Sequence, residues 1–370
     1  MKKITLLLVT FFLQFSMNAQ DKIYNLLIGT YTNNCESDGI YVYDFSIDSG
    51  DFALKNSTQN VENPSYLTIS ANTKNIYSVN ENGENSSISA FSYNPKSGKM
   101  DLLNQENSHG ADPCFIIADE KNIIVANYSG GNISVFGIEK NGEAGSLKQL
   151  VQHSGSSVNK ERQERAHVHQ VVFSPDKKYV LVNDLGVDKI FVYKYNAAST
   201  DKILEQKTII ETKPGSGPRH LTFSNDGKFV YVLGELDGNI STYKYNNGNL
   251  KKIDETTLVA KDFKGKIGAA DIHISPNGKF LYATNRGDAN TISTFAINNK
   301  GGLNIVNHSS TKGKSPRNFV IDPTGKFLLV ANQDSNNVVI FKIDSQTGKL
   351  TDTGKRIEVC SPVCLVFGKQ

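Results

Sequence analysis

Seven similar segments recur along the 370-residue chain, and each begins at a proline or its equivalent followed by an alternating apolar stretch. The proline-equivalent positions, called anchors below, are separated by 49, 55, 50, 51, 47 and 46 residues. A fixed period close to fifty indicates a repeat architecture. The segments are NPSYLTIS from Asn63, DPCFIIAD from Asp112, HVHQVVFS from His167, GPRHLTFS from Gly217, GAADIHIS from Gly268, SPRNFVID from Ser315 and SPVCLVFG from Ser361.

Each unit continues with further short strand-like stretches separated by Gly, Asn and Asp turns, and no long helical period is present. A repeat of about fifty residues with four strands is typical of a propeller blade. We therefore predict an all-β fold, a seven-bladed β-propeller with four-stranded blades. Because the chain ends just after the seventh inner strand, that blade must take its other three strands from YNLLIGTY, GIYVYDF and DFALKN, so residues 365–367 should pair beside residues 26–31.

The first twenty residues differ from the repeats. Lys2 and Lys3 precede an apolar stretch over residues 4–15, and small and polar residues follow it. This pattern predicts a secretory signal peptide at residues 1–20, too short to span a membrane. Residues 21–370 would then form a single propeller domain, exported to the periplasm or secreted.

Export makes the four cysteines candidates for disulfide bonds, and four cysteines allow three pairings. Cys35 follows the second strand of the closing blade, whereas Cys360 just precedes the inner strand of the same blade. Antiparallel neighbours place these two positions on one face. A bridge between Cys35 and Cys360 is therefore compatible with the geometry and would lock the ring closed.

The charge balance argues against nucleic acid as a partner. The chain has 40 basic and 37 acidic residues, a net charge of +3 that gives no basic patch. We expect a small-molecule ligand instead.

Two sets of residues should lie around one mouth of the central channel. The start of an inner strand and the end of the following strand share a face, because antiparallel neighbours run in opposite directions. A concave funnel that gathers cations, an imidazole and carboxylates is the default place for a ligand. The residues after the anchors are Ser65, Cys114, His169, Arg219, Ala270, Arg317 and Val363, and those ending the second strands are Tyr31, Glu81, Tyr128, Asp184, Glu235, Arg286 and Gln333.

A purely structural interpretation remains open for each of these residues. The arginines could join neighbouring blades through salt bridges with Glu235 and Asp184. For His220 and His273 we favour satisfied imidazoles packed between blades, and Asp271 could simply cap a turn. His167 points to the same face as His169, so both a structural role and a role in the site remain open for it.

Several motifs resemble the seven-bladed lactonase family, which includes propeller-type 6-phosphogluconolactonases and the fungal carboxy-cis,cis-muconate cyclase. They are HVHQVVFSPD, DLGVDKIFVY, GSGPRHLTFSNDGKFVYVLGEL, GAADIHISPNGKFLYATNR and SPRNFVIDPTGKFLLVANQ, and the resemblance spans residues 25–367. It implies the same propeller fold and a carboxylic ester hydrolase that acts on a sugar lactone, either 6-phosphogluconolactone or gluconolactone. It also implies four catalytic residues, His169, Arg219, Glu235 and Arg286.

Lactone hydrolysis needs a base to deprotonate water and cations to stabilise the oxyanion. Either Glu235 or His169 could be the base, and we expect His167, Asp184 and Arg317 to contact the substrate, with Arg317 as a clamp for a phosphate or carboxylate. We expect no cofactor, and no metal-ligand cluster is apparent, although Glu81, Asp184 and Glu235 on one rim leave room for a cation. Two alternatives remain: a muconate-type lactonizing cycloisomerase and a non-catalytic binding scaffold.

Overall fold

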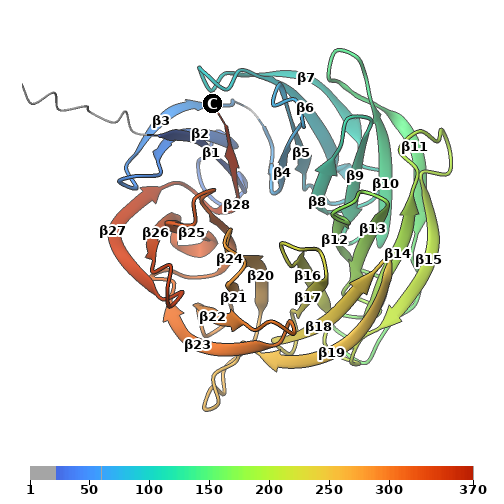
Figure 1. Cartoon of the computed structure of the whole chain (residues 1–370). Helices are drawn as coiled ribbons and strands as arrows, with labels where there is room; N and C mark the ends of the chain where they lie inside the picture. Colours follow the sequence, from blue (N-terminus) through green and yellow to red (C-terminus); the bar gives the residue numbers. More distant parts are fainter. Residues whose placement is uncertain (1–21, 60, 370) are drawn as a thin grey trace, which may run out of the picture.

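The computed structural model describes residues 22–59 and 61–369, so the predicted signal peptide lies outside the described residues. The chain forms seven four-stranded antiparallel sheets arranged around a central axis (Figure 1). Each sheet is one blade, and successive strands run from the channel to the periphery. The prediction of a seven-bladed propeller is confirmed.

The strands are named by their distance from the channel. The inner strands are β4 (Leu67–Ile69), β8 (Pro113–Ala118), β12 (Val168–Phe173), β16 (Pro218–Phe223), β20 (Ala269–Ile274), β24 (Pro316–Ile321) and β28 (Pro362–Gly368). The second strands are β5 (Asn75–Asn80), β9 (Asn122–Asn127), β13 (Tyr179–Asp184), β17 (Phe229–Gly234), β21 (Phe280–Asn285), β25 (Phe327–Asn332) and β1 (Ile23–Thr30).

The third strands are β6 (Ser87–Tyr93), β10 (Asn132–Ile138), β14 (Lys189–Tyr195), β18 (Asn239–Asn246), β22 (Thr291–Ile297), β26 (Asn337–Ile343) and β2 (Ile40–Ser46). The outer strands are β7 (Met100–Asn107), β11 (Ala144–Gln152), β15 (Leu204–Glu211), β19 (Asn249–Thr257), β23 (Leu303–Ser310), β27 (Leu350–Glu358) and β3 (Phe52–Ser57). Two short 3₁₀ helices, η1 (Gly83–Asn85) and η2 (Gln333–Ser335), follow β5 and β25.

The closing blade combines the two ends of the described chain. Strand β28 pairs antiparallel with β1, with Leu26 opposite Phe367 and Ile28 opposite Leu365. Cys35 and Cys360 form a disulfide in this blade, with their Cα atoms 6.0 Å apart. Both the predicted closure and the predicted disulfide are confirmed, whereas Cys114 and Cys364 are buried free thiols.

We expect the double variant Cys35→Ser/Cys360→Ser to lower the free energy of unfolding by about 2–5 kcal/mol, because the bridge restrains a very long loop in the unfolded chain. The two cysteines are 325 residues apart in sequence. Urea titration of the oxidised protein measures the change. Reduction of the wild type should reproduce it and leave the double variant unaffected. An unchanged urea midpoint in the double variant would show that the bridge does not stabilise the ring.

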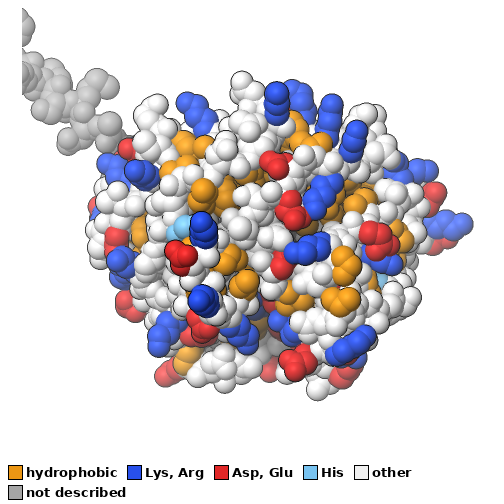
Figure 2. All heavy atoms as spheres, turned by 90° about the horizontal axis from the view of Figure 1, so that it is seen from below, with side chains coloured by type: hydrophobic (Ala, Val, Ile, Leu, Met, Phe, Trp, Pro, Cys, Tyr) orange, Lys and Arg blue, Asp and Glu red, His pale blue; other side chains and the backbone are white. Residues whose placement is uncertain are grey.

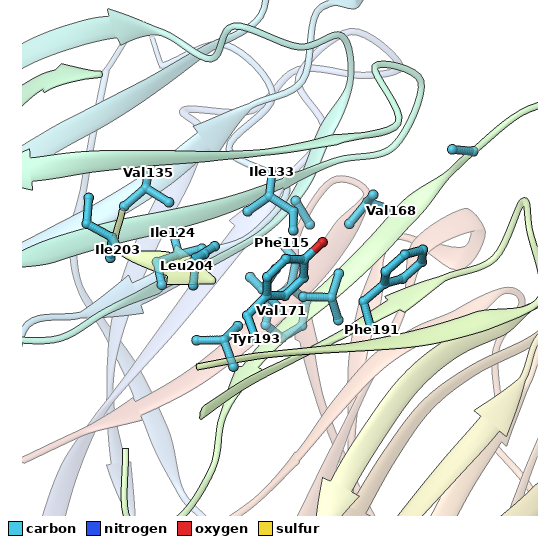
Figure 3. Close-up of a cluster of buried hydrophobic side chains, with 14 of the residues drawn as sticks. Phe115, Ile124, Ile133, Val135, Val168, Val171, Phe191, Tyr193, Ile203 and Leu204 are labelled. Carbon is cyan, nitrogen blue, oxygen red and sulfur yellow. The ribbon is translucent and has the colours of Figure 1, made fainter. Parts of the chain in front are cut away.

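The hydrophobic core lies between blades. Strands β8–β10 of one blade and β12–β14 of the next enclose Phe115, Ile124, Val135, Val171 and Tyr193 (Figure 3). Such face-to-face packing of sheets follows from the alternation of side chains along each strand. Similar clusters fill other blade interfaces, so the packing holds the inner strands in fixed positions around the channel.

A belt of hydrogen bonds joins neighbouring blades at the channel. Each inner strand is an edge strand, and its free N–H groups need partners. At four of the seven belt positions (the second residue after each anchor), the side chain of one blade accepts a hydrogen bond from the backbone N–H of the next inner strand. The donor–acceptor pairs are Leu221 N to Gln170 Oε1 (2.6 Å), Phe319 N to Asp271 Oδ2 (3.2 Å), Leu365 N to Asn318 Oδ1 (2.7 Å) and Leu67 N to Cys364 Sγ (3.4 Å).

The surface carries no single-sign patch on the side shown in Figure 2, where basic, acidic and apolar side chains are intermingled around the edge of the ring. Among the described residues, no helix has the length and apolar character required to cross a bilayer.

Candidate active site

The residue after each anchor is turned toward the mouth by a local irregularity of the inner strand. The register shifts between Pro113 and Phe115, between Val168 and Gln170, between Pro218 and His220, and between Pro316 and Asn318. A β-bulge of this kind re-aims the unpaired side chain. The side chains re-aimed in these four blades are those of Cys114, His169, Arg219 and Arg317.

The residue before the anchor also has an unusual backbone conformation. It adopts a positive φ in several blades, between 38° and 61°. Left-handed conformations at non-glycine residues are costly and gather at functional sites. The residues concerned are Asn63, Asp112, Gly217, Ser315 and Ser361.

The residues that end the second strands are placed by one repeated hydrogen bond. The backbone N–H of each donates to the carbonyl of the residue before the anchor, as from Glu235 to Gly217 (2.8 Å) and from Arg286 to Gly268 (2.9 Å). In the β12–β15 blade the donor is Leu185, which bonds His167 O at 2.9 Å. The mouth position of this blade is therefore Leu185, and the expectation that Asp184 occupies it is wrong by one residue.

Asp184 instead lies within the wall, fully buried. Its carboxylate accepts hydrogen bonds from His167 N (2.8 Å) and Gly186 N (3.1 Å) and lies 2.8 Å from His153 Nδ1. These contacts fix the backbone that leads into the inner strand carrying His169. The sequence pattern was misleading because Asp184 in the motif NDLG looks equivalent to Glu235 in the motif GEL. Asp184 in fact stands one position earlier in the repeat.

Glu235 is the centre of a buried ion cluster. Its Oε1 lies 2.6 Å from Arg162 Nη2, and its Oε2 lies 2.9 Å from Arg219 Nε and 3.2 Å from Arg286 Nη2. Burial by itself would raise the pKa of Glu235, but the charges of Arg286, Arg219 and Arg162 outweigh it and lower the pKa to about 2. The carboxylate therefore stays ionised and is a weak base at neutral pH.

Two of the three arginines are also bonded to the backbone. Arg219 Nη1 donates to Ala270 O, and Arg286 Nε donates to Gly268 O at 3.1 Å. Burial lowers the pKa of Arg219 to about 10, and the like charge of Arg286 adds to this effect. Arg219, Glu235 and Arg286 come from the β16–β19 blade and the next, so salt bridges do join blades here, as the structural alternative proposed.

Arg162 was not found by the sequence analysis. It lies in the connection between β11 and β12, which has no counterpart in the repeat, so no alignment of blades could reveal it. The only signal was the length and basic character of the insertion VNKERQERAHVH. In addition to Glu235, its Nη2 donates to the hydroxyl of Tyr128 at 3.2 Å.

His169 lies beside this cluster and is 5% exposed. Its Nδ1 is 3.8 Å from Cys114 Sγ, and its ring meets the Tyr128 ring edge-on at 5.5 Å. Nε2 has no hydrogen-bond partner among residues 22–59 and 61–369. Burial, followed by the charge of Arg219, holds the pKa of His169 well below its usual value, so the imidazole is neutral at neutral pH.

Arg317 approaches from another side of the mouth. Its guanidinium lies over the Tyr31 ring, 5.5 Å from the centroid, and the Tyr31 hydroxyl donates to Glu81 Oε2 at 2.8 Å. Burial lowers the pKa of Arg317, but Tyr31 and Glu81 outweigh it and raise the pKa above its usual value. None of its N–H groups has a hydrogen-bond partner in the part of the chain that the structure describes.

The other histidines near the channel have structural partners. His167 stacks on Tyr128 at 4.5 Å, and its two ring nitrogens lie 3.1 Å from Tyr128 O and from Glu164 Oε1. It thus lies behind Tyr128. His220 Nδ1 lies 2.8 Å from Asp271 Oδ1.

The opposite oxygen of Asp271 is 2.9 Å from His273 Nε2 and also accepts a hydrogen bond from Asn318. The expectation of a satisfied imidazole between blades is confirmed for His220, whose Nε2 lies 3.3 Å from Arg219 Nη1, whereas the His273 side chain is 37% exposed and bonds Asp271 of its own strand. Asp271 joins blades rather than capping a turn. In the described part of the chain no three His, Cys, Asp or Glu side chains are grouped so as to hold a metal ion.

Fold and site together define a propeller enzyme in which a neutral imidazole and several arginines meet at one mouth of the channel. Residues 25–367 match the family model of the seven-bladed β-propeller lactonases. The chain belongs to this family, and it is a lactone-hydrolysing carboxylic ester hydrolase.

Relatives with known names and structures support this assignment. The chain is 40% identical over 332 residues to the 6-phosphogluconolactonase of Formosa agariphila, covering 88% of this chain and 94% of the relative. It is 32% identical to the 6-phosphogluconolactonase of Bacillus subtilis, covering 92% and 97%. Among solved structures, the periplasmic gluconolactonase of Pseudomonas aeruginosa superposes with a TM-score of 0.88 at 36% identity, covering 94% of this chain and 99% of that one.

Proposed function

We propose that the protein hydrolyses a sugar lactone that carries an anionic group, of the 6-phosphogluconolactone kind, outside the cytoplasm. One observation carries the proposal: the neutral imidazole of His169 and the guanidinium of Arg317 share one mouth, and neither His169 Nε2 nor the N–H groups of Arg317 have a hydrogen-bond partner among the described residues. Both residues directly follow an anchor, and the register shift in each inner strand turns them toward the same mouth.

The charge of the mouth favours an anionic substrate. Arg162, Arg219, Arg286 and Arg317 face two carboxylates, Glu81 and Glu235, which leaves two positive charges uncompensated. A phosphate monoester carries a charge between about −1.5 and −2 at neutral pH and would balance them. The named 6-phosphogluconolactonase relatives agree with this substrate class.

In the proposed reaction His169 Nε2 accepts a proton from water, and the oxygen attacks the lactone carbonyl carbon. The carbonyl oxygen becomes an oxyanion, which Arg317 stabilises with its free N–H groups. Collapse of the intermediate breaks the ring C–O bond, and His169 returns the proton to the departing alkoxide. Glu235 orients Arg219 and Arg286 and does not transfer the proton, because its pKa of about 2 makes it too weak a base.

Export rests on three observations. The leader has the pattern of a signal peptide. Disulfides such as Cys35–Cys360 persist in oxidising compartments, and the similar gluconolactonase of Pseudomonas aeruginosa is periplasmic.

A lactone panel tests the substrate. Glucono-δ-lactone, its 6-phosphate and muconolactones are assayed with residues 21–370, with and without chelator, after subtraction of spontaneous hydrolysis. We expect the phosphorylated lactone to give the highest kcat/KM. Turnover of muconolactones alone would favour the cycloisomerase, and no hydrolysis of either sugar lactone would refute the proposal.

The pH profile tests the base. Since His169 remains neutral far below pH 6.5, we expect kcat/KM for glucono-δ-lactone to stay level down to pH values well below 6.5 and to fall only when Nε2 is protonated. The free energy of unfolding should also fall as the pH is lowered. His169 binds a proton below about pH 6.5 in the unfolded chain but not in the folded protein, so acid favours unfolding. An acid limb centred near pH 6.5 would contradict the assignment, and Arg317→Gln should move the limb to higher pH.

A further inference from the structure

The connection between β11 and β12 is unusual in length and in position. It comprises residues 153–167 and is the longest such connection in the described part of the chain; residues 258–268 link β19 to β20, and residues 108–112 and 311–315 suffice at two other blade junctions. Its residue Arg162 contacts Glu235 of the next blade and Tyr128 of the preceding one. The insertion therefore delivers a cation over the mouth that the repeated blades themselves do not supply.

Hydrogen bonds hold this loop in place. Ser157 Oγ donates to Asp188 Oδ2 at 2.5 Å, and the same oxygen accepts from Gly215 N at 2.6 Å. The side chain of Gln163 is buried and its Nε2 donates to Leu185 O at 2.9 Å. Arg162 thus stands on a loop that is tied both to its own blade and to the segment leading into Arg219.

The three arginines around Glu235 differ in exposure. The side chain of Arg219 is 2% exposed, that of Arg286 18% and that of Arg162 40%. Arg219 and Arg286 also donate hydrogen bonds from further N–H groups to backbone carbonyls. On Arg162 only Nη2 is engaged, so among the described residues Nε and Nη1 have no hydrogen-bond partner.

We propose that Arg162 determines specificity for the anionic group of the substrate, donating through Nη1 to a phosphate oxygen while Nη2 stays on Glu235. The proposal rests on the lactonase function proposed above. The N–H groups of Nη1 have no hydrogen-bond partner among the described residues, and a charge-assisted hydrogen bond from a guanidinium to a phosphate oxygen is about twice as strong as a neutral one. Glu235 fixes the orientation of the Arg162 guanidinium, and Arg317 remains free for the carbonyl oxygen.

The test separates binding of the anion from chemistry. Arg162→Gln should raise KM for 6-phosphoglucono-δ-lactone by about 10- to 100-fold and leave kcat within about threefold. For glucono-δ-lactone, which lacks the phosphate, the loss of kcat/KM should be at least about tenfold smaller than for the phosphorylated lactone. Inorganic phosphate should inhibit wild-type hydrolysis of glucono-δ-lactone competitively, and this inhibition should weaken by a similar factor in the variant. Arg162→Lys should recover part of the loss as a point charge.

Arg165→Gln is the matched control, because Arg165 lies on the same loop, its side chain is 63% exposed, and its only ion-pair partner among the described residues is Glu164, at 3.4 Å. It should behave as the wild type. Equal effects of Arg162→Gln on both lactones, or no effect on either, would overturn the proposal. If the wild type hydrolyses neither lactone, the proposed function is refuted. Calorimetric titration with inorganic phosphate then tests the role of Arg162 separately. That role is refuted if Arg162→Gln binds phosphate as tightly as the wild type.

Discussion

Replacement of His169 by glutamine is expected to lower kcat/KM for the sugar lactone by about 10²- to 10⁴-fold, the usual contribution of a general base. The melting temperature should change by no more than a few degrees. The imidazole has a free Nε2, and its Nδ1 has only a 3.8 Å contact with the Cys114 thiol, so its removal breaks no strong bond. Initial rates and thermal melting are measured on the same preparation.

His308→Gln provides the control, because His308 lies on the outer strand β23 and its only hydrogen-bond partner in the described part of the chain is Ser293 Oγ, at 2.8 Å. It should leave the rate unchanged. Wild-type turnover in His169→Gln would show that another group deprotonates the water. Loss of both rate and stability in His169→Gln would make the residue a structural one.

Glu235→Gln should be damaging in a different way. Its carboxylate compensates three arginines in a buried cluster, and breaking a buried ion pair typically costs about 3–5 kcal/mol. We expect a loss of free energy of unfolding of this size. Because Arg219 and Arg286 would lose their orientation, we also expect kcat to fall by about 10²- to 10³-fold.

From sequence alone, such variants would be expected to separate catalysis from stability, with the rate lowered and the melting temperature nearly unchanged. The geometry of the cluster replaces that expectation with a loss of both. Arg219→Gln/Glu235→Gln removes one charge of each sign, so it should regain part of the stability lost in Glu235→Gln but none of the rate.

Asp101→Asn removes an acid from the exposed Lys99–Asp101 pair and should change stability by less than about 0.5 kcal/mol. If Glu235→Gln proves as mild as this surface variant, the cluster does not carry the energy assigned to it. A double variant that recovers the rate as well as the stability would show that turnover does not depend on the orientation of Arg219 by Glu235.

The repeat made most of the architecture predictable. Seven anchors define seven blades, and the three surplus N-terminal strands define the closure and with it the Cys35–Cys360 bridge. The same regularity brings His169, Arg219, Glu235, Arg286 and Arg317 to one mouth. Residues that belong to the repeat can be placed by alignment alone.

What the repeat does not contain could not be predicted. Arg162 stands on an insertion found in one blade junction, and the offset between Asp184 and Leu185 depends on which backbone N–H meets the carbonyl of His167. The choice between His169 and Glu235 as the base was also out of reach. It depends on how many cations surround each group once both are buried, which is a property of the folded ring.

The pairing of β28 with β1 has a consequence for protein engineering. Because the last strand lies beside the first, a short linker joining them would allow the chain to be opened at another blade junction, giving a circular permutant with the same ring. In such a permutant the Cys35–Cys360 bridge would no longer enclose a loop of 325 residues but only the linker and its flanks. Its entropic contribution would shrink accordingly, so the permutant would rely on the hydrogen-bonded belt and the packing between blades to stay closed.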